Sequence, residues 1–118
     1  MILPGSTAAV KGDEGAGVYA ASKAAVRSFA RTWANELKHR RIRVNAIAPG
    51  PIETPSVRGA FSDPQQPEQF KEFFSALVPL GRMGSTDEIA DAVLFLASSR
   101  SSFVTGSNLN VDGGFTQI

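Results

Sequence analysis

Two short apolar runs, each stopped by a proline-glycine pair, constrain the fold of this chain more than any other feature. Residues 1–3 are apolar and end at the pair at 4–5, and residues 43–48 alternate before ending at the pair at 49–50. Proline cannot donate a hydrogen bond to a strand ladder, so each run predicts a short strand that ends there. A third short strand is predicted over residues 108–111.

Helical periodicity fills the intervals between these strands. Residues 18–40 predict a long helix with one buried stripe at spacings of three and four: Val26, Phe29, Ala30, Trp33 and Leu37. Residues 68–77 predict a short helix with one apolar face, suited to a substrate pocket or to core or interface packing: Phe70, Phe73, Phe74 and Leu77. Ser85 or Thr86 is predicted to cap a third helix. The predicted order of elements is strand, helix, strand, helices and strand. This order predicts right-handed crossovers and a parallel sheet, and therefore an α/β fold.

Composition excludes several classes of partner. Of the 118 residues 42% are hydrophobic, the net charge is +1, and cysteine is absent. This charge gives no electrostatic case for nucleic acid or an anionic membrane, and no disulfide or zinc-thiolate site can form. No apolar run approaches the roughly 20 residues of a membrane span, and the start does not resemble a signal peptide. A cytoplasmic protein without metal, nucleic acid or membrane as a partner is predicted.

A tyrosine and a lysine stand four residues apart near the start of the predicted long helix, thirteen residues after a serine. Positions 19 and 23 share one face of a helix, and an ammonium beside a phenol favours the phenolate. Such a tyrosine is a competent general acid or base. Ser6 follows a predicted strand end, where the sites of parallel sheets gather. Ser6, Tyr19 and Lys23 are therefore predicted to move a proton to or from a carbonyl or alcohol oxygen.

Each candidate residue also has an ordinary structural explanation. A tyrosine can pack on a lysine stem, and Ser6 or its neighbour Thr7 can cap a turn. The segment 49–54 follows the second strand, where Gly50 allows a flat ligand to approach the backbone and Thr54 offers a hydroxyl to an amide; it is equally a proline-stiffened turn. The only histidine, His39, is predicted to be a solvated partner of the helix dipole.

Taken together, these motifs resemble the C-terminal half of the short-chain dehydrogenase/reductase family. The resemblance spans almost the whole chain and keeps the family's order and spacing. It is carried by Gly5-Ser6-Thr7, Tyr19-Ala20-Ala21-Ser22-Lys23-Ala24-Ala25, Arg43-Val44-Asn45-Ala46-Ile47-Ala48-Pro49-Gly50, Pro51-Ile52-Glu53-Thr54, Pro79-Leu80-Gly81-Arg82, Glu88-Ile89-Ala90, and Thr105-Gly106 with Val111-Asp112-Gly113-Gly114. The implied fold is the C-terminal part of a doubly wound, parallel-sheet Rossmann-like domain, with residues 1–118 as its catalytic and substrate-binding half.

The resemblance also implies roles. Tyr19 would be the general acid/base, Lys23 would assist it and bind the nicotinamide ribose, and Ser6 would polarise the substrate oxygen. A further set would lie against the nicotinamide of NAD or NADP: Pro49, Gly50, Ile52 and Thr54. The reaction would be hydride transfer between NAD(P) and a small carbonyl or alcohol substrate. The family's helix with the tyrosine and lysine often builds a subunit interface, which implies a homodimer or homotetramer.

The family's glycine-rich nucleotide loop, its NAD/NADP selector and its Asn-Ala-Gly strand end have no counterpart in these residues. The N-terminal nucleotide-binding half is therefore expected to lie upstream of residue 1, and the isolated chain is expected to be inactive. Two other hypotheses stay open. One is a non-catalytic, truncated module that folds by self-association or by pairing with a full-length homologue. The other is a binder of small ligands that performs no chemistry.

Overall fold

Three parallel strands form the centre of the computed structural model, which describes residues 1–59 and 61–118. They are β1 (Ile2–Pro4), β2 (Asn45–Pro49) and β3 (Asn108–Val111), in the spatial order β1-β2-β3. Leu3 is in register with Ala46, and Ala46 with Asn108. The predicted parallel sheet is confirmed, with the strands within two residues of their predicted positions.

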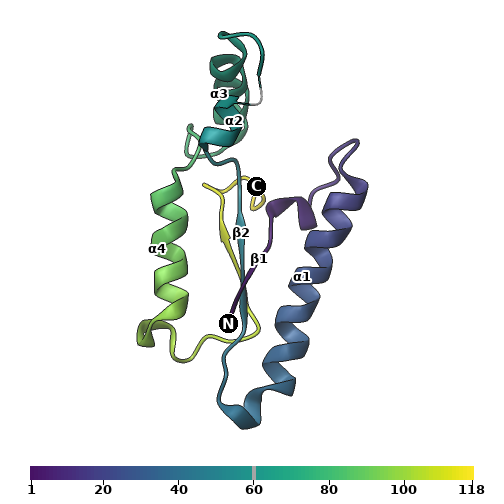
Figure 1. Ribbon diagram of the computed structural model, residues 1–118, viewed down its shortest axis with the longest axis vertical. Helices are drawn as coiled ribbons and strands as arrows, with labels where there is room; N and C mark the ends of the chain where they lie inside the picture. Colours follow the sequence, from purple (N-terminus) through teal and green to yellow (C-terminus); the bar gives the residue numbers. More distant parts are fainter. Residues whose placement is uncertain (60) are drawn as a thin grey trace.

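Two long helices cover opposite faces of this sheet, as Figure 1 shows. Helix α1 (Gly17–Glu36) packs on β1 and β2, and α4 (Thr86–Ala97) packs on all three strands. Between these layers, residues 45–48 of β2 are all buried. A central strand buried on both faces is typical of a parallel sheet flanked by helices, and the predicted α/β class is confirmed.

The predicted stripe of α1 is correct except at one position. Ala30 is buried against Val44 and Ala46, and Val26 and Trp33 pack partly buried around them, as does Leu37. Phe29 is instead 47% exposed and stacks on the Trp33 ring at 4.9 Å between centroids. Neighbouring helix positions point about 100° apart, so the helix that turns Ala30 onto the sheet leaves Phe29 at the margin.

The first predicted helix is divided near its end. After α1 comes a turn of 3₁₀ helix, η2 (Lys38–Arg40), and Arg41 then adopts a left-handed conformation with φ of 56°. This turn redirects the chain toward β2. Two further short 3₁₀ turns, η1 (Thr7–Ala9) and η3 (Ser99–Ser101), follow β1 and α4.

A helical arm connects β2 to α4 beyond the carboxyl ends of the strands (Figure 1). It contains α2 (Pro55–Gly59) and α3 (Gln66–Leu77). The sequence predicts an exposed, irregular segment over residues 52–67, and helix α2 within it was not predicted. The arm returns to α4 through Ser85, whose hydroxyl accepts from the Glu88 amide while the Glu88 carboxylate accepts from the Ser85 amide. The predicted cap at Ser85 is therefore confirmed.

The amino end of the sheet is closed by a network of polar groups. The Arg43 guanidinium donates to the carbonyl oxygens of Leu96, Ser98 and Val104 at 3.0–3.2 Å. Asn45, which is 1% exposed, donates to the same Val104 oxygen and accepts from the amide and hydroxyl of Ser107. The network joins the end of α4, the loop before β3 and the start of β2 into one unit.

None of the helices in the described part of the chain is both long enough and apolar enough to cross a membrane. Likewise, the described residues include no group of three or more His, Cys, Asp or Glu arranged to hold a metal ion.

Candidate active site

At the carboxyl end of the sheet, a cavity of about 630 Å³ brings together residues from five parts of the chain, one of which is the tail after β3. Ser6 follows β1, Tyr19 lies in the first turn of α1, and Pro49 and Gly50 end β2. The arm contributes the phenylalanines of α3. Four of the seven predicted site residues thus meet where the strands end, as expected for a site on a parallel sheet.

The serine is held by a local turn. Ser6 is extended and caps η1, with its Oγ accepting a hydrogen bond from the Ala8 amide at 3.1 Å. A hydroxyl that accepts in this way still has its own proton to donate. Ser6 therefore performs the capping role considered in the sequence analysis, and it also faces the cavity with a donor available to a ligand oxygen.

Tyr19 and Lys23 lie on one face of α1, as their spacing predicted. The Lys23 Nζ lies 5.6 Å from the centroid of the Tyr19 ring and donates to the Pro4 carbonyl oxygen at 3.1 Å. Tyr19 is 53% exposed and lines the cavity. The ammonium is thus fixed between the tyrosine ring and the end of β1, while the ring stays accessible to a ligand.

Gly50 also has an intramolecular reason to be glycine. A Cβ atom at this position would lie 2.6 Å from the Cβ of Asp112, far closer than two carbon atoms can approach. The Gly50 amide donates to the Val111 carbonyl at 3.0 Å, which holds β2 and β3 together at this end. The close approach that the sequence suggested for a flat ligand is made, in the chain itself, by Asp112, the residue that follows β3.

Ile52 and Thr54 do not line the cavity that holds Tyr19. Ile52 forms a single bridge with Gly84 and faces a separate cavity of about 50 Å³. Thr54 lies beside Ser85 in another hollow, and its Oγ1 accepts from the Val57 amide at 3.3 Å. These two predicted cofactor contacts therefore occupy the base of the arm rather than the cavity of Ser6 and Tyr19.

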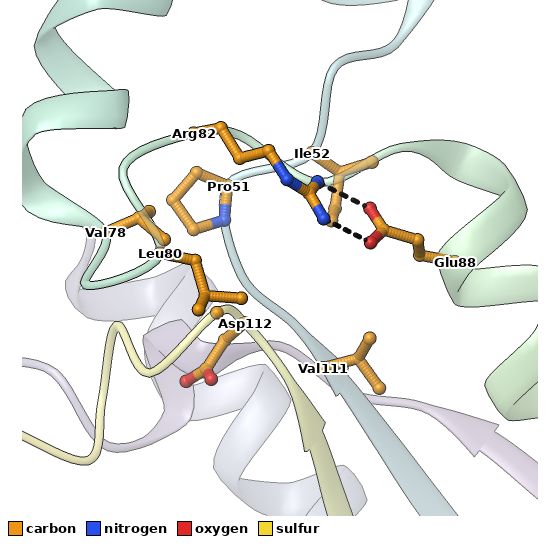
Figure 2. A pocket seen from close by; sticks show the side chains of 10 residues that line it. Pro51, Ile52, Val78, Leu80, Arg82, Glu88, Val111 and Asp112 are labelled. Carbon is orange, nitrogen blue, oxygen red and sulfur yellow. Dashed lines mark hydrogen bonds and ion pairs between the residues drawn. The ribbon is translucent and has the colours of Figure 1, made fainter.

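An ion pair closes the small cavity at the base of the arm, as Figure 2 shows. The Arg82 guanidinium donates to both carboxylate oxygens of Glu88, at 2.9 and 2.7 Å. Hydrogen bonding from Arg82, followed by that from the Ser85 amide, lowers the pKa of Glu88 from 4.5 to about 2. With Glu53 and Gly84 joined by a backbone hydrogen bond of 2.9 Å, this pair fixes the base of the arm and so the position of α3.

Three cavity residues escaped the sequence analysis: Lys11, Asp13 and Phe115. The Lys11 Nζ lies 3.6 Å from the centroid of the Phe115 ring, a cation–π contact between the loop after β1 and the tail after β3. Both segments follow the carboxyl end of a strand, and parallel strands end at the same edge of a sheet. The parallel topology could therefore have predicted that this loop and this tail lie near the cavity. It does not determine which of their residues point into it.

Comparison with known proteins supports one family. A family model described as enoyl-(acyl carrier protein) reductase matches residues 1–116. The 3-oxoacyl-[acyl-carrier-protein] reductase of Thermotoga maritima is 47% identical over 92% of this chain and 42% of its own length. The glucose 1-dehydrogenase of Gluconobacter oxydans is 49% identical over 83% of this chain and 35% of its own length.

A solved structure gives the same result for the fold. The ligand-free aldohexose dehydrogenase of Thermoplasma acidophilum superposes with a TM-score of 0.91 at 35% identity, covering 99% of this chain and 48% of that one. The chain therefore spans somewhat less than half the length of these relatives. With its Rossmann-like sheet and its ordered motifs, this chain belongs to the short-chain dehydrogenase/reductase family.

Proposed function

We propose that this chain supplies the proton-transferring half of an oxidoreductase that interconverts a carbonyl and an alcohol with NAD or NADP. One observation carries the proposal: Ser6 and Tyr19, from different elements, line one cavity with Lys23 fixed beside the tyrosine. We expect the two hydroxyls to act on the same ligand oxygen. Side chains that served only in core packing or only on the surface would not need to meet at one cavity.

The three side chains divide the work on that oxygen. In the reducing direction the Tyr19 hydroxyl gives its proton to the substrate oxygen, and in the oxidising direction the phenolate takes it back. The Ser6 Oγ donates a hydrogen bond to the same oxygen and stabilises its developing negative charge. The Lys23 ammonium, held by the Pro4 carbonyl oxygen beside the Tyr19 ring, keeps a positive charge next to the proton-transferring group.

The residues present fit the nicotinamide end of the cofactor. NAD(P), when bound, supplies or accepts the hydride. Lys23 and Tyr19 offer N–H and O–H donors suited to ribose hydroxyls. Pro49 and Gly50 line the cavity together with Tyr19 and add no polar side chain to it, which suits contact with a planar ring. Ile52 and Thr54 remain candidates for the carboxamide of that ring, and they would reach it from the base of the arm.

Turnover is expected only when a nucleotide-binding half is present. The loop between β1 and α1 contains several glycines, but they do not have the Gly-x-Gly-x-x-Gly spacing of a loop that binds a pyrophosphate. A fusion tests this directly, with the unmatched part of the Thermotoga maritima reductase placed before Met1. The fusion is expected to bind NADH or NADPH and to reduce a carbonyl substrate, and the isolated chain to do neither. A folded fusion that bound neither nicotinamide cofactor would overturn the proposal.

Lys23 offers a sharper test within that fusion. Lys23→Met keeps much of the stem but removes the ammonium, so nicotinamide binding and turnover should both fall by about tenfold or more. Lys38→Met is the matched control, because the Lys38 Nζ bonds Asn35 at 3.0 Å near the C-terminal end of α1. Equal losses for the two variants would show that Lys23 has no special role.

A second proposal is self-association, either in a homodimer or homotetramer of the enzyme or as a non-catalytic module. Large apolar side chains are exposed on the outer surface of the molecule: Phe29 at 47%, Leu94 at 67% and Phe103 at 102%. Exposed apolar side chains on several elements favour association. Sedimentation of the isolated chain should give a mass of two or four copies. A compact monomer at micromolar concentration would contradict this.

A further inference from the structure

We propose that the substrate of this site is a carbonyl compound with an aromatic or medium-length apolar group, not a sugar, and that the phenylalanines of the cavity select it. The inference rests on the function proposed above and adds the substrate class. It comes from the cavity side chains that the proton-transfer mechanism does not use. They are Phe70, Phe73, Phe74, Leu77 and Phe115.

The chemistry of the cavity differs from one contributing segment to another. The segment from Ser6 to Tyr19 supplies every charged or hydroxyl-bearing side chain of the lining. The strand end at 49–51 adds only proline and glycine, and α3 and the tail add only phenylalanine and leucine. A sugar needs hydrogen-bonding partners around its ring, because each hydroxyl that loses water without a new partner costs affinity. A substrate with one polar carbonyl and one apolar group matches this division.

The α3 phenylalanines form a preassembled surface. The rings of Phe70 and Phe74 lie 4.5 Å apart between centroids, and those of Phe73 and Phe74 lie 5.2 Å apart at 89°. These are favourable tilted and edge-to-face arrangements. Ring–ring contact restricts the side chains before any ligand arrives, which lowers the entropy lost on binding.

Much of this surface is left uncovered by the chain itself. Phe73 is 61% exposed and Leu77 is 49% exposed, although both line the cavity. Exposed apolar side chains gathered in one concave place are typical of a binding site for an apolar group.

The tail adds a fourth ring in a fixed position. The Asp112 carboxylate accepts hydrogen bonds from the amides of Gly114 and Thr116 at 2.9 and 3.0 Å, which shapes the turn that carries Phe115. The Lys11 ammonium lies over the Phe115 ring. Lys11 is thus engaged by the ring, which leaves fewer free polar groups to bind a sugar.

The test is a binding measurement on the isolated chain, with acetophenone and D-glucose as probes and ring signals of labelled phenylalanine and tyrosine followed by NMR. Acetophenone should shift the Tyr19 and Phe73 signals in a saturable way, and glucose should not shift them. Saturable binding of glucose at concentrations similar to those of acetophenone, or no saturation by acetophenone, would overturn the proposal.

A matched pair of variants locates the bound ketone. Phe73→Ala should weaken acetophenone binding by about tenfold, because it removes one aromatic contact from the cavity. Phe103→Ala should leave binding unchanged, because Phe103 is fully exposed and is not part of the cavity lining. Equal affinities of the two variants would contradict the assignment of the phenylalanines.

This readout needs neither cofactor nor hydride transfer, so it separates two failures. Ketone binding without turnover by the fusion would count against the proposed reaction and leave the apolar site standing. Turnover of glucose by the fusion, with no ketone binding, would support the reaction and overturn the substrate class.

Discussion

The two ends of the sheet differ in whether their polar side chains are paired within the chain or face a cavity. At the amino end, Asn45 is buried and Arg43 is partly buried, and both side chains form hydrogen bonds with carbonyl, amide or hydroxyl groups of the chain. At the carboxyl end, Ser6 and Tyr19 face a cavity of about 630 Å³ beside partly exposed phenylalanines. The polar groups of the amino end are hydrogen-bonded within the chain, whereas those of the carboxyl end can bind a ligand. Substitutions at the amino end should therefore affect stability, and substitutions at the carboxyl end should affect binding.

The largest loss of stability is expected at Asn45. Asn45→Ala removes three hydrogen bonds at a site that is 1% exposed and leaves the Ser107 amide and hydroxyl without this acceptor, so the unfolding free energy measured in urea should fall by about 3 kcal/mol. Asn35→Ala, on the exposed face of α1, is the control and should cost less than about 1 kcal/mol. Similar losses at both positions would remove the distinction between the two ends.

Arg43 should come next. Arg43→Met keeps an apolar stem but removes three hydrogen bonds, so we expect a loss of about 2 kcal/mol. The loss is smaller than at Asn45 because Arg43 is only partly buried and its three acceptor oxygens keep a hydrogen bond from Asn45 or from the Ser101 hydroxyl. A change below about 0.5 kcal/mol in the same urea titration would show that the amino end does not depend on this network.

The base of the arm adds a pH-dependent contribution. The pKa of Glu88 is lowered to about 2 by Arg82, so the pair stabilises the fold above the ordinary value of 4.5, and this stability is lost as pH falls from about 4.5 toward 2. Glu88→Gln should show a smaller difference between urea midpoints at pH 5.5 and pH 2.5 than the parent chain. An identical difference in both proteins would show that the pair does not stabilise the base.

The smallest effect on stability is expected in the cavity. Phe73→Ala should change the unfolding free energy by no more than about 0.5 kcal/mol, because Phe73 is 61% exposed. The same substitution should weaken ketone binding, which sets it apart from both amino-end variants. A stability loss near that of Asn45→Ala would show that the phenylalanines are structural.

The sequence predicted the strands and the long helices because residues at their boundaries determine where they begin and end. Proline-glycine pairs end β1 and β2, and Ser85 begins α4, so each boundary follows from the residues at that point. Phe29 was misplaced because periodicity identifies a helix face but not its exact rotation on the sheet. Helix α2 was missed because its five residues are too few to show helical periodicity and lie in a segment rich in proline and serine.

The candidate site was predicted where residues lie at a strand end or in the first turn of the following helix. Ser6, Pro49 and Gly50 adjoin strand ends, and Tyr19 lies in the first turn of α1, so these residues meet in one cavity at the edge where the parallel strands end. Ile52 forms the bridge to Gly84 and Thr54 follows it, and that tertiary contact holds both at the base of the arm. The contact between Lys11 and Phe115 joins segments more than 100 residues apart, which no local pattern reports.

Replacing Tyr19 tests the central claim most directly. In the fusion with a nucleotide-binding half, Tyr19→Phe removes only the hydroxyl, so carbonyl reduction should fall by about a thousandfold while cofactor binding stays within a few fold of the parent. Carbonyl reduction by this variant within about threefold of the parent rate would contradict the account, because the proton would then come from some other group.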